Sequence, residues 1–174
     1  MPMNITGGKY NGQKIIAPDE NITRPTLSKV RMCVFNTLYS MMDFENASFL
    51  DMYAGSGIMS LEAISRGFEF ALSIEKNLKA ANIIKTNFKK FNSDNLELVI
   101  GDSTKICAKL NKKFDVIYID PPYFSGIYEK SLEAVKNIAN IVILEHVTDV
   151  DFKDFEVIKQ KKFSDKFLTF LKYN

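Results

Sequence analysis

The sequence predicts an α/β fold with a mostly parallel seven-stranded sheet that ends in an antiparallel hairpin. Five strand-like runs alternate with helix-like runs between residues 48 and 145, a pattern typical of right-handed βαβ units. Two further strand-like runs, 155–162 and 167–173, are separated only by residues 164–166. Because so short a connection cannot hold a crossover helix, these last two strands are expected to be antiparallel.

Residues 1–25 are predicted to form a small N-terminal hairpin extension, and residues 26–174 the main body of a single domain. Residues 3–17 alternate weakly between apolar and polar side chains and contain Gly7-Gly8 and Asn11-Gly12, which are typical of turns. Residues 18–25 form a polar connector. A chain of 174 residues is long enough for one substantial core, whereas two complete domains would be cramped.

A helix is predicted to follow the connector, with Thr26 as its N-cap. Its apolar residues Val30, Val34, Leu38 and Met41 or Met42 recur at spacings of three and four, and Arg31 and Asn36 are expected to point away from this apolar face. The remaining expected strands are 48–53, 70–74, 96–100, 114–119 and 141–145, and the remaining expected helices are 58–66, 78–91, 104–110 and 128–139.

The composition excludes several classes of protein. Hydrophobic residues make up 46% of the chain and charged residues 25%, which is ordinary for a soluble globular protein. The apolar runs fall far short of the roughly 20 residues of a membrane helix, and residues 1–14 lack the apolar stretch of a secretory signal. Cys33 and Cys107 are too few for a disulfide framework, and His146 adds no metal-binding spacing. We therefore expect a cytoplasmic monomer without a membrane or metal partner.

Basic residues gather near the N-terminus although the net charge is only +2. Residues 1–40 hold five basic and two acidic side chains, and two of the three arginines, Arg24 and Arg31, lie there. Because arginine binds phosphate or carboxylate through a bidentate fork, this placement suggests anion recognition. A solvated basic surface explains it equally well.

Acidic residues end four successive predicted strands. They are Asp51, followed by Gly55-Ser56-Gly57, and then Glu75, Asp102 and Asp120. Open α/β sheets bind ligands at the carboxyl ends of their strands, so these side chains are expected to share one site. The alternative is that they are only turn glycines and helix N-caps.

The loop that contains Gly55-Ser56-Gly57, together with Glu75 and Asp102, favours one class of ligand. Glu75 stands where a carboxylate grips both hydroxyls of a ribose, and Asp102 could accept a hydrogen bond from an adenine amino group. Residue 60 is serine instead of the third glycine of a dinucleotide-binding loop, and no lysine follows Gly57 as in a phosphate-binding loop. An adenosyl ligand without a pyrophosphate, such as S-adenosylmethionine, is therefore preferred.

The segment Asp120-Pro121-Pro122-Tyr123, called the acceptor motif below, follows a predicted buried strand. The two prolines restrict the backbone, so the Asp120 carboxylate and the nearby carbonyls are held stiffly beside an aromatic ring. Such a pocket suits a planar group that carries an amino group, and a nucleobase is the obvious candidate. The alternative is a proline turn that ends a strand, with Tyr123 as a half-buried cap.

Together these motifs resemble the RsmD-like bacterial methyltransferases, which methylate the exocyclic amino group of a guanine in small-subunit (16S) ribosomal RNA. The resemblance is carried by residues 51–67, Glu75-Lys76-Asn77, Gly101-Asp102 and the acceptor motif, and also by residues 7–15 and 23–31 with Phe35-Asn36. It implies a Rossmann-like class I methyltransferase fold, S-adenosylmethionine as cofactor, and ribosomal RNA or the small ribosomal subunit as partner.

The resemblance also implies roles for individual residues. Asp120, Pro121, Pro122 and Tyr123 would be catalytic, with Asp120 and the Pro121 carbonyl holding the amino hydrogens while Tyr123 stacks on the base. Phosphate contacts would come from Lys9, Lys14, Arg24 and Arg31. The cofactor would be held by Asp51, Tyr53, Ala54, Gly55, Ser56, Gly57, Glu75, Lys76, Asp102, Ser103 and Asp120.

The match has two departures, and other functions stay open. Met32 stands where the family usually carries an acidic residue, and the segment between Tyr123 and Ile141 is short. The cofactor loop and acceptor motif are shared with enzymes that methylate amino groups on DNA or on a protein glutamine. A non-catalytic scaffold that binds RNA or an adenosyl group is the alternative from another class.

Overall fold

The computed structural model describes residues 3–22 and 24–174. Residues 1 and 2, and Thr23 of the N-terminal motif, lie outside the described residues.

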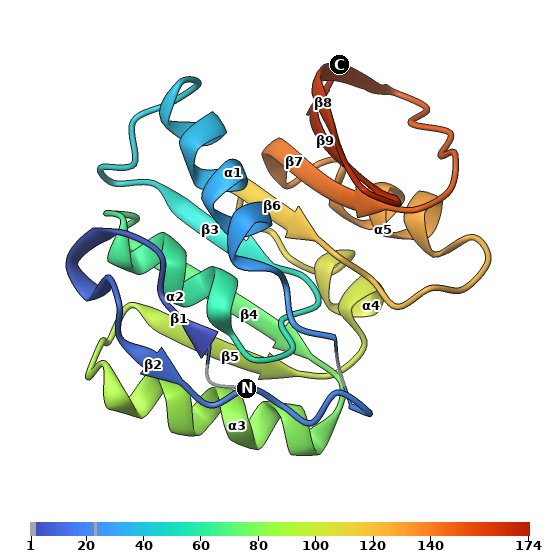
Figure 1. Ribbon diagram of the computed structural model, residues 1–174. Helices are drawn as coiled ribbons and strands as arrows, with labels where there is room; N and C mark the ends of the chain where they lie inside the picture. The colour runs from blue at the N-terminus through green and yellow to red at the C-terminus, as the bar shows by residue number, and fades with distance from the viewer. Residues whose placement is uncertain (1–2, 23) are drawn as a thin grey trace.

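Seven strands form one sheet, as the sequence predicts. They are β3 (Ser48–Asp51), β4 (Phe70–Glu75), β5 (Leu96–Ile100), β6 (Phe114–Ile119), β7 (Ala139–His146), β8 (Phe155–Phe163) and β9 (Lys166–Tyr173). Their order in the sheet is β5-β4-β3-β6-β7-β9-β8 (Figure 1). The first five are parallel, while β9 is antiparallel to both β7 and β8. The mostly parallel sheet and its C-terminal hairpin are therefore confirmed.

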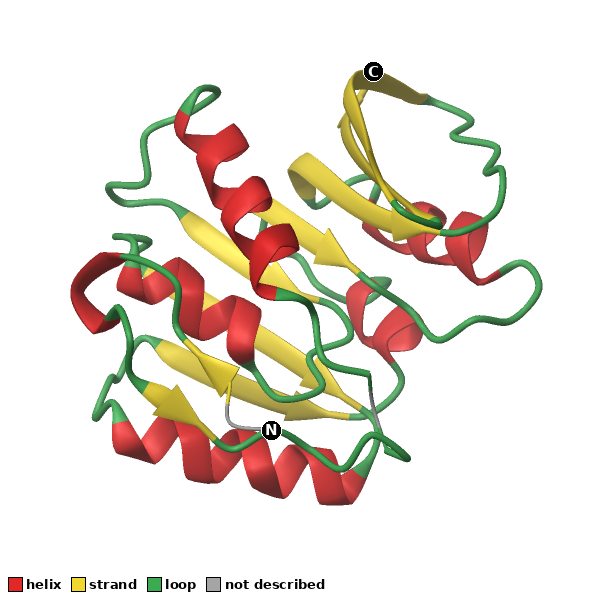
Figure 2. Cartoon of the chain, viewed as in Figure 1, coloured by secondary structure: helices red, strands yellow, loops and turns green. Residues whose placement is uncertain are grey.

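Helices cover both faces of this sheet (Figure 2). They are α1 (Ser28–Tyr39), α2 (Ile58–Ser65), α3 (Leu78–Lys90), α4 (Ser103–Cys107) and α5 (Ile127–Val135). Phe49 packs in the core beneath α1, α2 and α3, while its neighbour Leu50 packs with α4 and α5. Since successive side chains of a strand point to opposite faces, a strand covered on both sides is apolar throughout. Within the described ranges, no helix has the length and apolar character needed to cross a bilayer.

Three helix boundaries differ from the prediction by more than one residue or in their cap, and one of them is the end of α4, at Cys107 instead of residue 110. The N-cap of α1 is Leu27 instead of Thr26, since the Leu27 carbonyl accepts the first helical N–H groups, those of Val30 and Arg31. The Thr26 carbonyl accepts a hydrogen bond from the Arg31 guanidinium. Helix α5 ends at Val135, four residues before the predicted end. The chain there turns toward β7, and the Ile138 carbonyl accepts the backbone N–H of Phe114 at 2.7 Å.

The N-terminal hairpin consists of β1 (Met3–Asn4) and β2 (Lys14–Ile15), paired antiparallel as predicted. A hydrogen-bonded pair fastens it to α3: the Asn87 side chain accepts from the Ile16 N–H and donates to the Ile16 carbonyl, both at 2.9 Å. Met3, Ile5 and Ile15 are buried in the core shared with α1, α2 and α3. The hairpin is therefore packed on the sheet-covering helices.

Four side chains, called the Glu62 cluster, join the hairpin to α1 and α2. Glu62 is fully buried, and one of its carboxylate oxygens accepts hydrogen bonds from the Thr6 N–H and hydroxyl, both at 2.8 Å. The same oxygen lies 3.1 Å from Arg31 Nε, and the other lies 3.2 Å from Arg66 Nε. One carboxylate thus holds three segments of the chain together.

The expectation that Arg31 points away from the buried face of its helix, and with it the RNA-binding role given to Arg31, is wrong. Only 2% of this residue is exposed. Besides Glu62, its guanidinium donates hydrogen bonds to the carbonyls of Asn4 and Thr26. A cation buried and paired in this way has no surface left for a phosphate, and its partners come from distant segments that helix periodicity cannot reveal.

We expect Glu62→Gln to lower the free energy of unfolding by about 3–5 kcal/mol, since it leaves the Arg31 and Arg66 guanidinium groups buried without a counter-charge. Urea unfolding followed by circular dichroism measures the change. Glu133→Gln is the matched control, because Glu133 pairs with Lys136 on the exposed surface of α5. Equal unfolding midpoints for the two variants would contradict the importance of the Glu62 cluster.

Candidate active site

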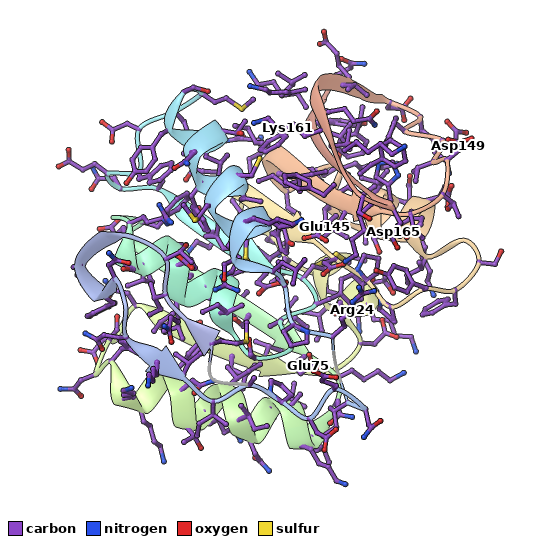
Figure 3. All side chains as sticks on the ribbon, in the orientation of Figure 1. Arg24, Glu75, Glu145, Asp149, Lys161 and Asp165 are labelled. Carbon is purple, nitrogen blue, oxygen red and sulfur yellow. The ribbon has the colours of Figure 1, made fainter. Side chains whose placement is uncertain are left out.

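A cavity of about 470 Å³ opens at the carboxyl ends of the parallel strands. It lies where the strand order reverses between β3 and β6, which is the usual ligand-binding point of such sheets. In Figure 3, Arg24, Glu75 and Glu145 lie along this edge of the sheet. Residues of the N-terminal connector and of the loops after β3, β4 and β6 line the cavity.

The loop after β3 needs two glycines for different reasons. Gly55 has a φ of 57°, and its N–H donates a hydrogen bond to Glu75 Oε2 at 2.8 Å. Gly57 has a φ of 79°, and a Cβ atom there would approach the Phe88 ring to 2.9 Å. Gly55 lines the cavity, whereas Gly57 lets α3 pack closely behind the loop.

Both carboxylate oxygens of Glu75 accept local hydrogen bonds, whereas Asp102 accepts them through one oxygen only. The second Glu75 oxygen accepts the Asn77 N–H at 2.8 Å, and each carboxylate oxygen has room for a further hydrogen bond. Asp102 caps α4, with Oδ1 accepting from the Thr104 hydroxyl at 2.8 Å and the Lys105 N–H at 3.1 Å. These hydrogen bonds lower the pKa of Asp102, the one from the Thr104 hydroxyl contributing most. Asp102 is therefore both a helix cap and part of the cavity lining.

Asp51 provides a buried acceptor at the end of β3. Only 1% of the residue is exposed, and its Oδ1 has no hydrogen-bond partner among the residues that the structure describes. Burial, followed by the nearby carboxylates of Asp120 and Glu75, raises its pKa well above the usual value. Because an unpaired buried oxygen is costly, Asp51 is suited to a ligand that brings a donor or a positive charge.

The acceptor motif follows β6 directly and lines the same cavity as Glu75 and Asp102. Tyr123 is 51% exposed, so its ring is free to stack on a planar ligand. Enclosure by the protein raises the pKa of Asp120 to about 7, with a further upward contribution from Glu145. Lys166 and Arg24 act in the opposite direction. At neutral pH, Asp120 is therefore poised between a proton acceptor and a proton donor.

Most of the predicted site residues line the cavity, and some do not. Among the predicted phosphate-binding residues, Arg24 lines it, whereas Lys9 and Lys14 do not. The hairpin turn that carries Lys9 packs against the C-terminal end of α3, where the Tyr10 and Phe91 rings are 4.8 Å apart. That end of α3 lies away from the carboxyl edge of the sheet. The cavity-lining predicted residues are Arg24, Asp51, Tyr53, Ala54, Gly55, Ser56, Glu75, Lys76, Asp102, Ser103, Asp120, Pro121, Pro122 and Tyr123.

Tyr118, Glu145 and Lys166 belong to the site although no sequence motif singled them out. Tyr118 and Lys166 line the cavity, and Glu145 bonds to both of them. Glu145 could have been predicted from the sequence, because it ends the expected strand 141–145 just as the other acids end their strands. Lys166 could not have been predicted, since it lies in the expected three-residue turn 164–166.

Comparison with known proteins gives a family and a fold. The family model described as "Conserved hypothetical protein 95" matches residues 3–172. The ribosomal RNA small subunit methyltransferase D of Buchnera aphidicola (Acyrthosiphon pisum) is 34% identical over 76% of this chain and 69% of that protein. A putative rRNA methyltransferase of Bacillus subtilis is 28% identical over 87% of this chain and 86% of that protein.

Two solved structures have the same fold. A putative methyltransferase from Escherichia coli superposes with a TM-score of 0.88, covering 100% of this chain and 99% of that chain at 21% identity. A tRNA (uracil-54, C5)-methyltransferase from Pyrococcus abyssi, solved with S-adenosyl-L-homocysteine, gives a TM-score of 0.71 at 16% identity, covering 98% of this chain and 44% of that chain. Since the family model spans nearly the whole sequence and the motifs agree with it, the chain belongs to this RsmD-like family.

Proposed function

We propose that the protein transfers a methyl group from S-adenosylmethionine to the exocyclic amino group of a guanine in small-subunit ribosomal RNA. The observation that carries the proposal is the acceptor motif, whose carboxylate and exposed ring line one cavity together with Glu75 and Asp102. The names of the relatives support ribosomal RNA as the substrate. The choice of a guanine amino group is the finer part of the proposal.

The residues of the cavity fit S-adenosylmethionine. Glu75 would hold the ribose hydroxyls, and Asp102 with the Ser103 N–H would face the adenine. The unpaired Asp51 oxygen and the Gly55 loop would hold the amino acid part, where a buried acceptor meets a positive charge. When bound, this cofactor supplies an electrophilic methyl carbon attached to a sulfonium.

The chain's own residues would then prepare the amino group. The lone pair of a guanine amino group is delocalised into the ring, so the nitrogen is a poor nucleophile. Hydrogen bonds to the Asp120 carboxylate and the Pro121 carbonyl would hold both amino hydrogens and aim the nitrogen at the methyl carbon. Tyr123 would stack on a base that is splayed out of its strand. After transfer, the Asp120 carboxylate takes the surplus proton.

Substrate phosphates would meet Arg24 first, because this residue lines the cavity and is exposed. Lys9 and Lys14 would contact RNA farther from the reacting base. In this proposal, residues 1–25 are a recognition extension of a catalytic core formed by residues 26–174.

A methyl-transfer assay with labelled S-adenosylmethionine tests the function directly. We expect labelling of small ribosomal subunits or their RNA, and nuclease digestion with mass spectrometry should find the methyl group on a guanine amino nitrogen. Asp120→Asn should lower kcat by about 10²- to 10⁴-fold, because it removes the proton acceptor, while S-adenosylmethionine still binds. Exclusive labelling of DNA or of a protein glutamine would favour the rival methyltransferases, and full activity of the variant would remove Asp120 from the mechanism.

Glu75→Ala should weaken the binding of S-adenosylmethionine by about 10- to 100-fold, since it removes a charged acceptor for two ribose hydroxyls. Isothermal titration calorimetry measures the dissociation constant. Glu97→Ala makes the same chemical change at an exposed position of the neighbouring strand β5, outside the cavity, and should leave the affinity unchanged. An unaltered affinity of the Glu75 variant would show that this carboxylate is not a ribose contact.

The rate of methyl transfer should depend on pH through Asp120. Its pKa of about 7 means that the carboxyl group is protonated below neutrality and cannot accept a proton there. We therefore expect kcat to rise with pH, to reach half its plateau near pH 7 and to level off above it. Single-turnover rates between pH 5.5 and 8.5 measure this profile. A rate that stays constant over this range would exclude Asp120 as the proton acceptor.

A further inference from the structure

One positively charged side chain of the C-terminal hairpin, Lys166, lines the cavity. Lys166 is the first residue of β9, and its Nζ lies 3.1 Å from Glu145 Oε2. Glu145 is only 3% exposed, and its other oxygen accepts the hydroxyl hydrogen of Tyr118. Both carboxylate oxygens of Glu145 are thus engaged by groups that line the cavity.

The strand register brings this ion pair beside the acceptor motif. Ile119 of β6 pairs with Leu144 of β7, so the next residues, Asp120 and Glu145, are neighbours across the two strands. Both side chains lie on the same face of the sheet, because residues at matching positions of paired strands point the same way. On the other side of the cation, Lys166 Nζ lies 5.7 Å from the centre of the Tyr123 ring, within the range of a cation–π contact.

Stability alone is a weak reason for this arrangement. A buried ion pair costs desolvation energy that its own attraction only partly recovers, and apolar residues of similar size often stabilise a protein more. Here the Glu145–Lys166 pair lies at the edge of the sheet, between Asp120 and the ring of Tyr123. Charged groups that sit in a cavity and perturb one another are typical of functional sites.

We infer that Glu145 and Lys166 are positioning residues of the methyl-transfer site. Tyr118 fixes Glu145, Glu145 fixes the Lys166 ammonium, and this ammonium holds the Asp120 carboxylate and the Tyr123 ring in one corner of the cavity. The antiparallel hairpin therefore contributes to catalysis, besides closing the sheet. This inference rests on the proposed function and adds two residues to its machinery.

The charges around Asp120 make the inference measurable. Burial works against the charged form of Lys166, but the carboxylates of Asp120 and Glu145 raise its pKa, so it stays a cation. Removing this cation raises the pKa of Asp120, whereas neutralising Glu145 lowers it. Among the described residues, the titratable and charged groups that act on Asp120 are Arg24 of the connector, Asp51 of β3, Tyr118 of β6, Tyr128 of α5, Glu145 of β7 and Lys166 of β9. Glu75 of β4 and Tyr123 of the acceptor motif line the same cavity.

The test follows the Asp120 carboxyl carbon by NMR in protein labelled with 13C-aspartate, with the signal assigned by its loss in Asp120→Asn. We expect the titration midpoint to move to higher pH in Lys166→Met and to lower pH in Glu145→Gln. Lys166→Arg, which keeps the cation, should stay closer to the wild-type midpoint. Lys172→Met is the matched control: it changes an exposed lysine of the same strand, six residues and about 20 Å farther along.

The pH profile of kcat should move in the same two directions. At pH 7, Lys166→Met should lower kcat about tenfold or more, while the dissociation constant for S-adenosylmethionine stays unchanged. A merely structural ion pair would give equal losses in both variants, without opposite movements of the profile.

Two results would overturn the inference. One is an Asp120 titration midpoint in folded Lys166→Met that equals the wild-type midpoint. The other is a shift of this midpoint in Lys172→Met as large as the shift in Lys166→Met. If Lys166→Met fails to fold, Glu145→Gln provides the test: a lower Asp120 midpoint supports the inference, and an unchanged midpoint overturns it. The NMR titration needs no substrate. If the wild-type protein methylates no RNA, the proposed function fails, whereas the midpoints still report whether the pair controls Asp120.

Discussion

The Glu62 carboxylate is the interaction on which the arrangement around the cavity depends. It is buried in α2 and binds Thr6 of the hairpin, Arg31 of α1 and Arg66, the residue that follows α2. Because Arg31 also binds the Thr26 carbonyl, the same network anchors the end of the connector that lines the cavity. The Glu62 carboxylate, which does not line the cavity, thus helps to fix one side of the site. Both of its oxygens are paired, because a buried charge without partners would be strongly destabilising.

The chemical character of the site follows from where parallel strands end. Asp51, Glu75 and Asp120 follow neighbouring strands, and the parallel register gathers their carboxylates at one edge. Burial there raises the pKa of Asp51 and of Asp120, so both carboxyl groups take up a proton more readily than an exposed aspartate does. In the proposed function, this edge would hold an amino-bearing base and accept the proton that methyl transfer releases.

Much of the site was predictable because it depends on short-range patterns. Glycines at residues 55 and 57, acids at the strand ends and prolines after β6 each stand directly at or after a predicted strand, where the sequence alone places them. Glu145 followed the same rule and could have been included with them. Thr26 was expected to cap α1 by the same local reasoning, but the helix begins one residue later, with Leu27 as its N-cap.

The sequence by itself determined the fold class, the direction of each strand, the acidic edge and the family, because alternation of apolar residues and the chemistry of turns are local properties. Only the tertiary structure decided which charged side chains face water and which face one another. Arg31 is buried by partners 27 and 31 residues away, and Lys166 enters the cavity to meet a carboxylate 21 residues away. Spacing along the chain carries no record of such pairs, since they form when separate strands and helices pack together.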